Sequence, residues 1–198
     1  MANDALIVVD AQVDFCPDGA LPVSEGDLVM PVLNRCMSAA AAHGVPIYAS
    51  RDWHPEQTLH FKAQGGPWPP HCVAGTPGAE FHPALALPAS AQVVSKGMSG
   101  RDDGYSAMEA TLPSGQTLAD ALRAGGVTRV WVGGLATDYC VRATVLDARK
   151  AGLDTRVLTD AIRPVELVPG DGERALREMT DAGATLTTAD EMVAQSGS

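Results

Sequence analysis

Short, uninterrupted apolar runs alternate along this chain with longer segments of helical periodicity. An apolar run without a polar face is typical of a strand that is buried on both sides of a parallel sheet. We expect strands at 5–9, 45–50, 92–95, 129–133, 155–158 and 184–187, and helices from Leu28 to a stop at Gly44 and at 118–124, 137–151 and 172–181. This order predicts an α/β fold of three layers, with helices on both faces of one sheet.

The charge and cysteine content limit the classes of function. The chain has 14 Lys and Arg against 24 Asp and Glu, a net charge of −10, which makes a broad basic surface for nucleic acid or anionic membrane a poor hypothesis. No apolar run approaches the roughly 20 residues of a membrane span. Four widely spaced cysteines without a CxxC pair indicate a reducing, cytoplasmic setting. We expect one domain over 1–198; a homo-oligomer is possible, and the sequence leaves that open.

Polar residues follow four of the expected strands. Asp10 follows the first, Asp52 lies just past the second, Lys96 follows the third, and Cys140 comes shortly after the fourth. Ligands of open parallel sheets bind outside the carboxyl ends of the strands, so these side chains should converge. Thr137 is the expected helix N-cap, and the positive end of that helix would lower the pKa of a thiol at Cys140. Asp10 is then a candidate base and Lys96 a candidate partner for a thiolate, although a structural cysteine, a turn cap and a solvated lysine are the ordinary alternatives.

A carboxylate and several imidazoles cluster in the region that follows the second strand. Asp52 and His54 are two residues apart, so in extended chain they project the same way, and His60 and His71 lie in the same Pro- and Gly-rich stretch. A long loop of this kind, here about 52–90, is usually functional in a compact domain. Carboxylate and imidazole ligands suit Zn²⁺, Fe²⁺ or Mn²⁺, and scattered surface histidines are the alternative.

Five segments carry a family resemblance that covers nearly the whole chain. They are ALIVVDAQVDFC at 5–16, SRDWHP at 50–55, WPPHCVAGTPGAEFHP at 68–83, VSKG at 94–97 and GGLATDYCVRATVLDA at 133–148. They resemble the nicotinamidase/pyrazinamidase branch of the isochorismatase-like cysteine hydrolases. The resemblance implies a Rossmann-like, mainly parallel six-stranded sheet flanked by helices. It also implies hydrolysis of nicotinamide to nicotinate and ammonia, and of pyrazinamide to pyrazinoate, through a cysteine thioester in NAD salvage.

The resemblance assigns roles to individual positions. Asp10, Lys96 and Cys140 match the catalytic triad. Asp52, His54 and His71 match the ligands of one divalent metal, with zinc first and iron or manganese as alternatives, and His60 falls where some members supply a fourth ligand. The family's cis peptide falls between Leu135 and Ala136, and the N–H groups of Ala136 and Cys140 match the oxyanion hole. The positions that match the substrate pocket are Phe15, Trp68, Tyr105, Leu135, Ala136 and Tyr139.

Three other interpretations stay open at this stage. The protein could be a metal-hydroxide amidase in which Cys140 is structural, or another isochorismatase-like hydrolase that acts on a different amide or on a vinyl ether. A non-catalytic binding module on the same scaffold is the third. The metal motif argues against the second, and the presence of Asp10, Lys96 and Cys140 argues against the third.

Overall fold

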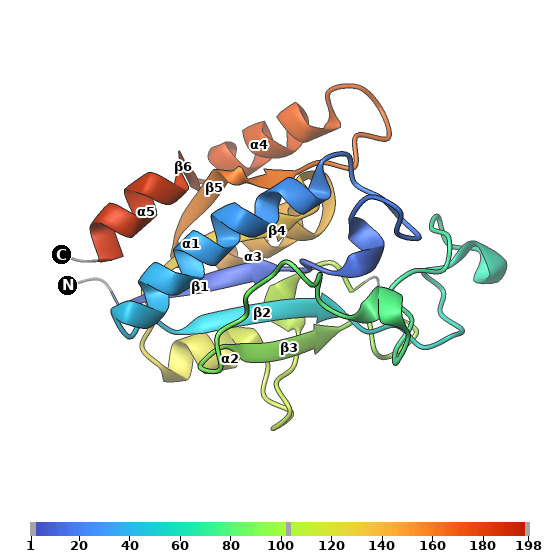
Figure 1. Cartoon of the computed structure of the whole chain (residues 1–198), viewed down its shortest axis with the longest axis horizontal. Coiled ribbons are helices and arrows are strands. Elements are labelled where there is room, and N and C mark those ends of the chain that lie inside the picture. Colours follow the sequence, from blue (N-terminus) through green and yellow to red (C-terminus); the bar gives the residue numbers. More distant parts are fainter. Residues whose placement is uncertain (1–2, 102–103, 197–198) are drawn as a thin grey trace.

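Six parallel strands form one sheet at the centre of the molecule (Figure 1). The computed structural model describes residues 3–101 and 104–196. The sheet order is β3-β2-β1-β4-β5-β6, and every pairing is parallel. The strands are β1 (Asp4–Val9), β2 (Ile47–Asp52), β3 (Gln92–Lys96), β4 (Arg129–Leu135), β5 (Asp154–Arg163) and β6 (Thr185–Thr187). The predicted six-stranded α/β fold is confirmed.

Both faces of the sheet are covered by helices, as the uninterrupted apolar runs require. Along β1, Leu6 and Val8 belong to one buried cluster, whereas Ala5, Ile7 and Val9 belong to the other. The first cluster packs against α1 (Val29–Ala42) and α5 (Ala189–Ser196). The second packs against α2 (Leu118–Ala124), α3 (Arg142–Lys150) and α4 (Asp171–Asp181).

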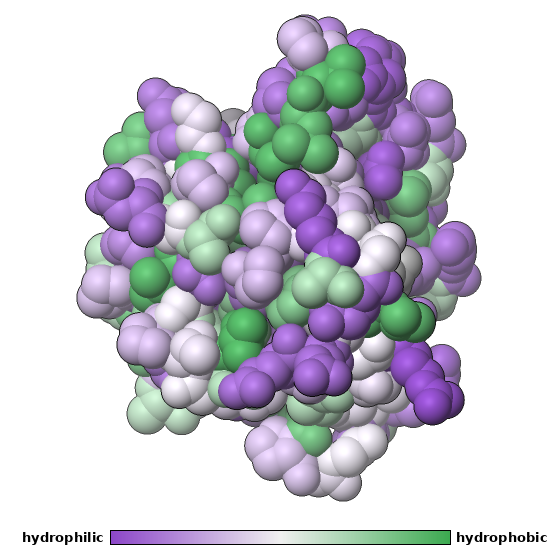
Figure 2. Space-filling view, turned by 90° about the vertical axis from the view of Figure 1, so that its right-hand side faces the viewer, coloured by the Kyte–Doolittle hydropathy of each residue, from purple (hydrophilic) through white to green (hydrophobic). Residues whose placement is uncertain are grey.

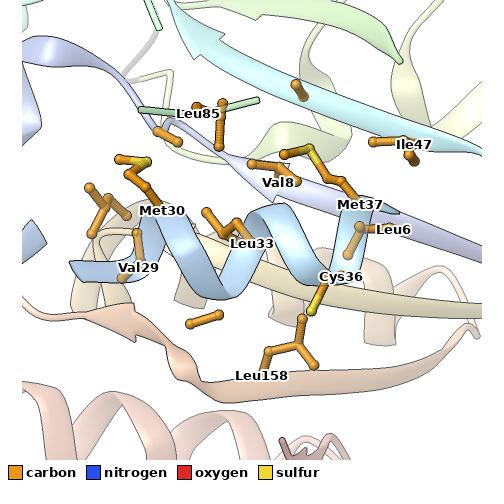
Figure 3. Close-up of a cluster of buried hydrophobic side chains, with 14 of the residues drawn as sticks. Leu6, Val8, Val29, Met30, Leu33, Cys36, Met37, Ile47, Leu85 and Leu158 are labelled. Carbon is orange, nitrogen blue, oxygen red and sulfur yellow. The ribbon is translucent and has the colours of Figure 1, made fainter. Parts of the chain in front are cut away.

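Helix α1 shows how the helical periodicity becomes packing. Its side chains Met30, Leu33 and Met37 lie three or four residues apart and belong to the apolar cluster between this helix and the sheet (Figure 3). Each such side chain contributes roughly 1.5–3 kcal/mol when it is fully buried. The polar residues of α1 lie on the opposite face, so only one face of the helix is part of the core.

The sheet order places a crevice at the carboxyl end of β1. The chain leaves β1 for β2 on one side and reaches β4 on the other, and ligands of open α/β sheets bind at such a switch point. The loops after β1 and β2 lie together at this end of the molecule (Figure 1). Figure 2 looks onto this end and shows apolar residues gathered toward the top of the view among mostly hydrophilic ones.

Two local expectations are corrected by the structure. The expected helix 137–151 begins as a π-helical turn, Thr137–Val141, and only then continues as α3. Ala136 occupies the N-cap, and the Thr137 hydroxyl is buried with no hydrogen-bond partner among the described residues, so the predicted Thr137 cap is wrong.

Helix α5 was not predicted at all. Its first N–H group, at Ala189, bonds to the carboxylate of Asp160 in β5, which lies 29 positions earlier in the chain. Among the described residues, no helix is long and apolar enough to cross a membrane.

Candidate active site

Asp10 is aimed at the crevice by the turn that ends β1. Its backbone adopts a φ of +45°, in the left-handed region that non-glycine residues rarely occupy. The Ser50 hydroxyl of β2 donates to Asp10 Oδ1 at 2.7 Å, and the Asp10 N–H donates to the Ser50 carbonyl at 3.1 Å. A buried carboxylate is therefore fixed by the neighbouring strand, with its second oxygen directed at Lys96.

Lys96 connects the charged groups of the crevice. It is the last residue of β3 and the register partner of Asp52, the last residue of β2, so the pleat places both side chains on one face. Its Nζ lies 2.7 Å from Asp10 Oδ2, 2.5 Å from Asp52 Oδ1 and 3.4 Å from Cys140 Sγ. The Lys96 side chain is only 2% exposed. Burial works to lower its pKa, but Asp10 and Asp52 raise it well above the ordinary value, and the ammonium stays charged.

Cys140 lies in the buried turn that follows β4. Burial raises the pKa of its thiol well above the ordinary value, Lys96 opposes this rise, and Asp10 and Asp52 add to it. The predicted net lowering of the Cys140 pKa is therefore wrong, because burial and the two carboxylates outweigh the lowering by Lys96. The resting thiol carries its proton.

The same burial makes Asp10 a suitable acceptor for that proton. Burial raises the pKa of Asp10 to about 6, although the Lys96 ammonium works in the opposite direction and Asp52 adds to the rise. At neutral pH Asp10 is thus ionised but more basic than an ordinary aspartate. A neutral thiol beside a basic carboxylate and a fixed ammonium can pass its proton as it attacks a carbonyl carbon.

Three imidazoles meet next to Asp52. His54, His60 and His71 each offer a nitrogen that lies within 4.8 Å of the other two. Asp52 Oδ2 lies 3.6 Å from His54 Nε2 and 4.0 Å from His71 Nε2. The far nitrogens are held by backbone carbonyls, with His54 Nδ1 at 3.1 Å from Gly97 and His71 Nδ1 at 2.8 Å from Pro69.

This arrangement fits a divalent metal. Backbone carbonyls that hold Nδ1 leave Nε2 free to ligate, and His54 Nε2 is a buried nitrogen without a hydrogen-bond partner among the described residues. Burial, together with His54 and His71, lowers the pKa of His60 to about 4, and burial lowers that of His71 as well. Although burial alone would raise it, the Lys96 ammonium holds the pKa of Asp52 well below its usual range. Neutral imidazoles and an ionised carboxylate are the forms that bind metals.

A narrow cavity opens above Cys140 and these histidines. The empty space between its walls, open mouth included, is about 290 Å³. Trp68 Nε1 donates to the Tyr105 hydroxyl at 2.9 Å, and the Trp68 ring meets Tyr139 edge-on with centroids 4.8 Å apart. The lining combines aromatic, metal-site and nucleophile residues, among them Phe15, Asp52, His60, Trp68, His71, Tyr105, Ala136, Tyr139 and Cys140. Aromatic side chains therefore form much of the wall around Cys140.

Leu135 differs from the other residues expected in the pocket. It is fully buried in the core, and its neighbour Ala136 reaches the cavity instead. The peptide bond between the two is cis, as predicted. Leu21 and Val165 also line the cavity, and neither was predicted. Both lie outside the motifs in irregular loops, where local periodicity carries no information about which side chains meet.

Two further residues, which the sequence analysis missed, position Asp52 and His54. Gln12 is fully buried, and its amide accepts from the Asp52 N–H and donates to the Asp52 carbonyl, both at 2.8 Å. A Cβ at Gly97 would lie 2.4 Å from His54 Cε1, so only glycine leaves room for that ring. The only sequence signal that could have identified Gln12 was its position between Asp10 and Asp14 in the first motif.

Comparisons with known proteins agree with this geometry. The family described as "Isochorismatase domain" matches residues 4–191. The chain belongs to the isochorismatase family. A curated nicotinamidase of Escherichia coli is 42% identical to this isochorismatase-family chain over 204 residues, which is 95% of this chain and 96% of the relative.

Solved structures of the family superpose closely. A pyrazinamidase of Pyrococcus horikoshii, solved in complex with zinc, is 47% identical with a TM-score of 0.86, and the match covers 94% of this chain and 99% of that one. A protein of L. infantum solved in complex with nicotinate is 36% identical with a TM-score of 0.82, covering 96% and 94%. The family resemblance stated from the motifs is confirmed.

Proposed function

We propose that this protein is a nicotinamidase, which hydrolyses nicotinamide to nicotinate and ammonia and accepts pyrazinamide as well. The observation that carries the proposal is a buried Asp10–Lys96–Cys140 cluster that shares Asp52 with a histidine-rich site on the floor of a narrow aromatic cavity. The nicotinamidase and pyrazinamidase relatives, and the nicotinate bound in the similar L. infantum structure, support this substrate class. The reaction belongs to NAD salvage, and the four free cysteines support a reducing, cytoplasmic setting.

The substrate ring occupies the cavity with its carboxamide over Cys140. Phe15 and Trp68 bury its faces, and Tyr105 and Tyr139 close the sides. Asp52, His54 and His71, with His60 as a fourth candidate, would hold one divalent metal, and zinc suits the donor set best. Such an ion supplies an electron-pair acceptor for the nitrogen of a pyridine or pyrazine ring.

The first half of the reaction forms a thioester. Asp10 takes the thiol proton of Cys140 as the sulfur bonds to the carboxamide carbon, and the Lys96 ammonium stabilises the negative charge that develops on sulfur. The carbonyl oxygen becomes an oxyanion, which the N–H groups of Ala136 and Cys140 bind. One such donor typically contributes about 3–4 kcal/mol of transition-state stabilisation. Asp10 then passes its proton to the nitrogen, the C–N bond breaks, and ammonia leaves.

The second half returns the enzyme to its starting state. Asp10, ionised again, takes a proton from water as the water oxygen bonds to the thioester carbon. The same oxyanion site receives the second tetrahedral intermediate. The C–S bond breaks, Cys140 recovers a proton from Asp10, and nicotinate is released. One water is consumed for each nicotinamide, and the protein is unchanged.

Ammonia release from nicotinamide by the purified protein tests the proposal. We expect Cys140→Ala to abolish release, because no nucleophile remains. Cys36→Ala is the matched control, since Cys36 is an equally buried thiol on α1, and it should retain activity. A Cys140→Ala variant that keeps substantial activity would refute the thioester route and favour attack by a hydroxide. A wild-type protein, supplied with zinc, that releases no ammonia would refute the substrate.

A further inference from the structure

The loop between β5 and α4, residues 164–170, forms one wall of the cavity through Val165. Its other large apolar side chains do not anchor it, because Leu167 is 61% exposed and Val168 is 57% exposed. Apolar burial beyond Val165 therefore contributes little to the position of this wall. Polar contacts must hold the loop in place.

Two carboxylates supply those contacts. Asp138, which is buried, accepts from the Val165 N–H at 2.8 Å and from the Glu166 N–H at 3.0 Å, one with each oxygen. Glu166 in turn accepts from the N–H groups of Gly170 at 2.5 Å and Gly172 at 3.1 Å, where α4 begins. Hydrogen bonds to ionised acceptors are the strong kind, and here they fix both ends of a short loop.

The backbone conformation of Glu166 also indicates that contacts with neighbouring groups hold the loop in place. Its φ of +59° lies in the left-handed region, which a residue with a side chain occupies only when its surroundings hold it there. The Asp138 carboxylate holds the Glu166 N–H, and the Glu166 side chain holds the next turn. Loss of either carboxylate would release the strain by letting the wall move.

Asp138 stands two residues before Cys140 in the same buried turn. Its carboxylate therefore fixes the distance between the nucleophile and the Val165 wall. We propose that Asp138 is a positioning residue that sets the width of the cavity and so favours a single six-membered ring over larger acyl groups. The proposal rests on the proposed amidase function for the reaction, and on the loop contacts alone for the selectivity.

The size of the effect follows from how pockets reject larger ligands. One extra methylene against a firm apolar wall costs roughly 10–200-fold in kcat/KM. A wall that can retreat loses most of this discrimination. We therefore expect the ratio of kcat/KM for a substituted ring to that for nicotinamide to rise about 10-fold when the wall is released.

The experiment compares nicotinamide with 5-methylnicotinamide and quinoline-3-carboxamide. The variants are Asp138→Ala, Asp138→Asn and Glu166→Gln, with Asp147→Ala as the control. Asp147 is an acid of α3 that pairs with Lys150 at the surface. Hydrogen exchange of the amides at Val165 and Glu166 reports the wall directly. We expect Asp138→Ala and Glu166→Gln to speed this exchange and relax selectivity, Asp138→Asn to lie between them and wild type, and Asp147→Ala to match wild type.

The outcomes distinguish a role of Asp138 in the Val165 wall from a role in the turn that carries Cys140. If Asp138→Ala lowers nicotinamide turnover but leaves selectivity and exchange unchanged, the carboxylate acts on the Cys140 turn and the proposal is wrong. If Glu166→Gln speeds exchange without relaxing selectivity, the Val165 wall does not set the width of the cavity and the proposal is wrong. Calorimetric binding of nicotinate and quinoline-3-carboxylate measures the same discrimination without turnover. A wild-type protein that binds nicotinate but hydrolyses no amide would refute the function. The selectivity proposal would then hold if nicotinate binds more tightly than quinoline-3-carboxylate, and it would fail if the two bind equally.

Discussion

Replacing Lys96 by Met should destabilise the fold as well as abolish catalysis. The ammonium pairs with Asp10 at 2.7 Å and with Asp52 at 2.5 Å, and its side chain is 2% exposed. Methionine fills a similar volume, so the packing changes little, but two carboxylates remain buried without a counter-charge. Breaking a buried ion pair by removing one partner costs about 3–5 kcal/mol.

Lys150→Met is the matched control. Its Nζ lies 2.9 Å from Asp147 Oδ1, a distance close to those around Lys96, but the Lys150 side chain is 77% exposed. Water already screens that pair, so its loss should leave the free energy of unfolding unchanged within error. The substitution and the ion-pair distances are nearly the same at the two sites, so the comparison tests burial together with the second carboxylate that Lys96 faces.

Urea unfolding and thermal melting, both at neutral pH in the presence of a chelator, measure the two variants without a contribution from bound metal. We expect the Lys96→Met midpoint to fall and the melting temperature to drop by about 6–20 °C, since about 1 kcal/mol corresponds to about 2–4 °C in a chain of this size. A loss of less than about 1 kcal/mol in the free energy of unfolding would refute the reasoning, because exposed ion pairs contribute no more than that.

Three further predictions follow from contacts around the metal site and the cavity. Gln12→Ala removes the amide that holds the Asp52 backbone at 2.8 Å, and competition with a chromophoric chelator should show zinc affinity about 10–100-fold lower. Gly97→Ala drives a methyl group to 2.4 Å from His54 and should lower the zinc content measured by mass spectrometry. Gly75→Ala, with a similar φ of +78° and no atom within 4 Å, should not. Benzamide, which lacks the ring nitrogen, should have a kcat/KM at least about 100-fold below that of nicotinamide, and equal values would contradict ring-nitrogen recognition.

The strands and the convergence of Asp10, Lys96 and Cys140 could be predicted because both depend on local pattern. A strand buried on two faces must be apolar throughout, and the carboxyl ends of parallel strands must share one edge. The residue types at those ends then indicate the chemistry. The spacing of Asp52 and His54 was informative for the same reason.

The remaining features depend on contacts between segments far apart in the sequence. Asp138 bonds to a loop 27 positions later, and Asp160 caps a helix 29 positions later. The pKa of Cys140 is set by burial, which no motif reports, so the helix position alone gave the wrong sign. The reactive residues could therefore be predicted from the sequence, whereas the residues that position them could not.

The place of β1 in the sheet also decides when the site can form. β1 pairs with β2, some 40 positions later, and with β4, more than 120 positions later. A nascent chain that has reached β3 can build β3-β2-β1 but leaves one edge of β1 unpaired, with Asp10 and Lys96 in place and no thiol opposite them. Arrival of β4 closes that exposed edge and delivers the nucleophile in the same event. Ammonia release during refolding would thus report the joining of the two halves of the sheet.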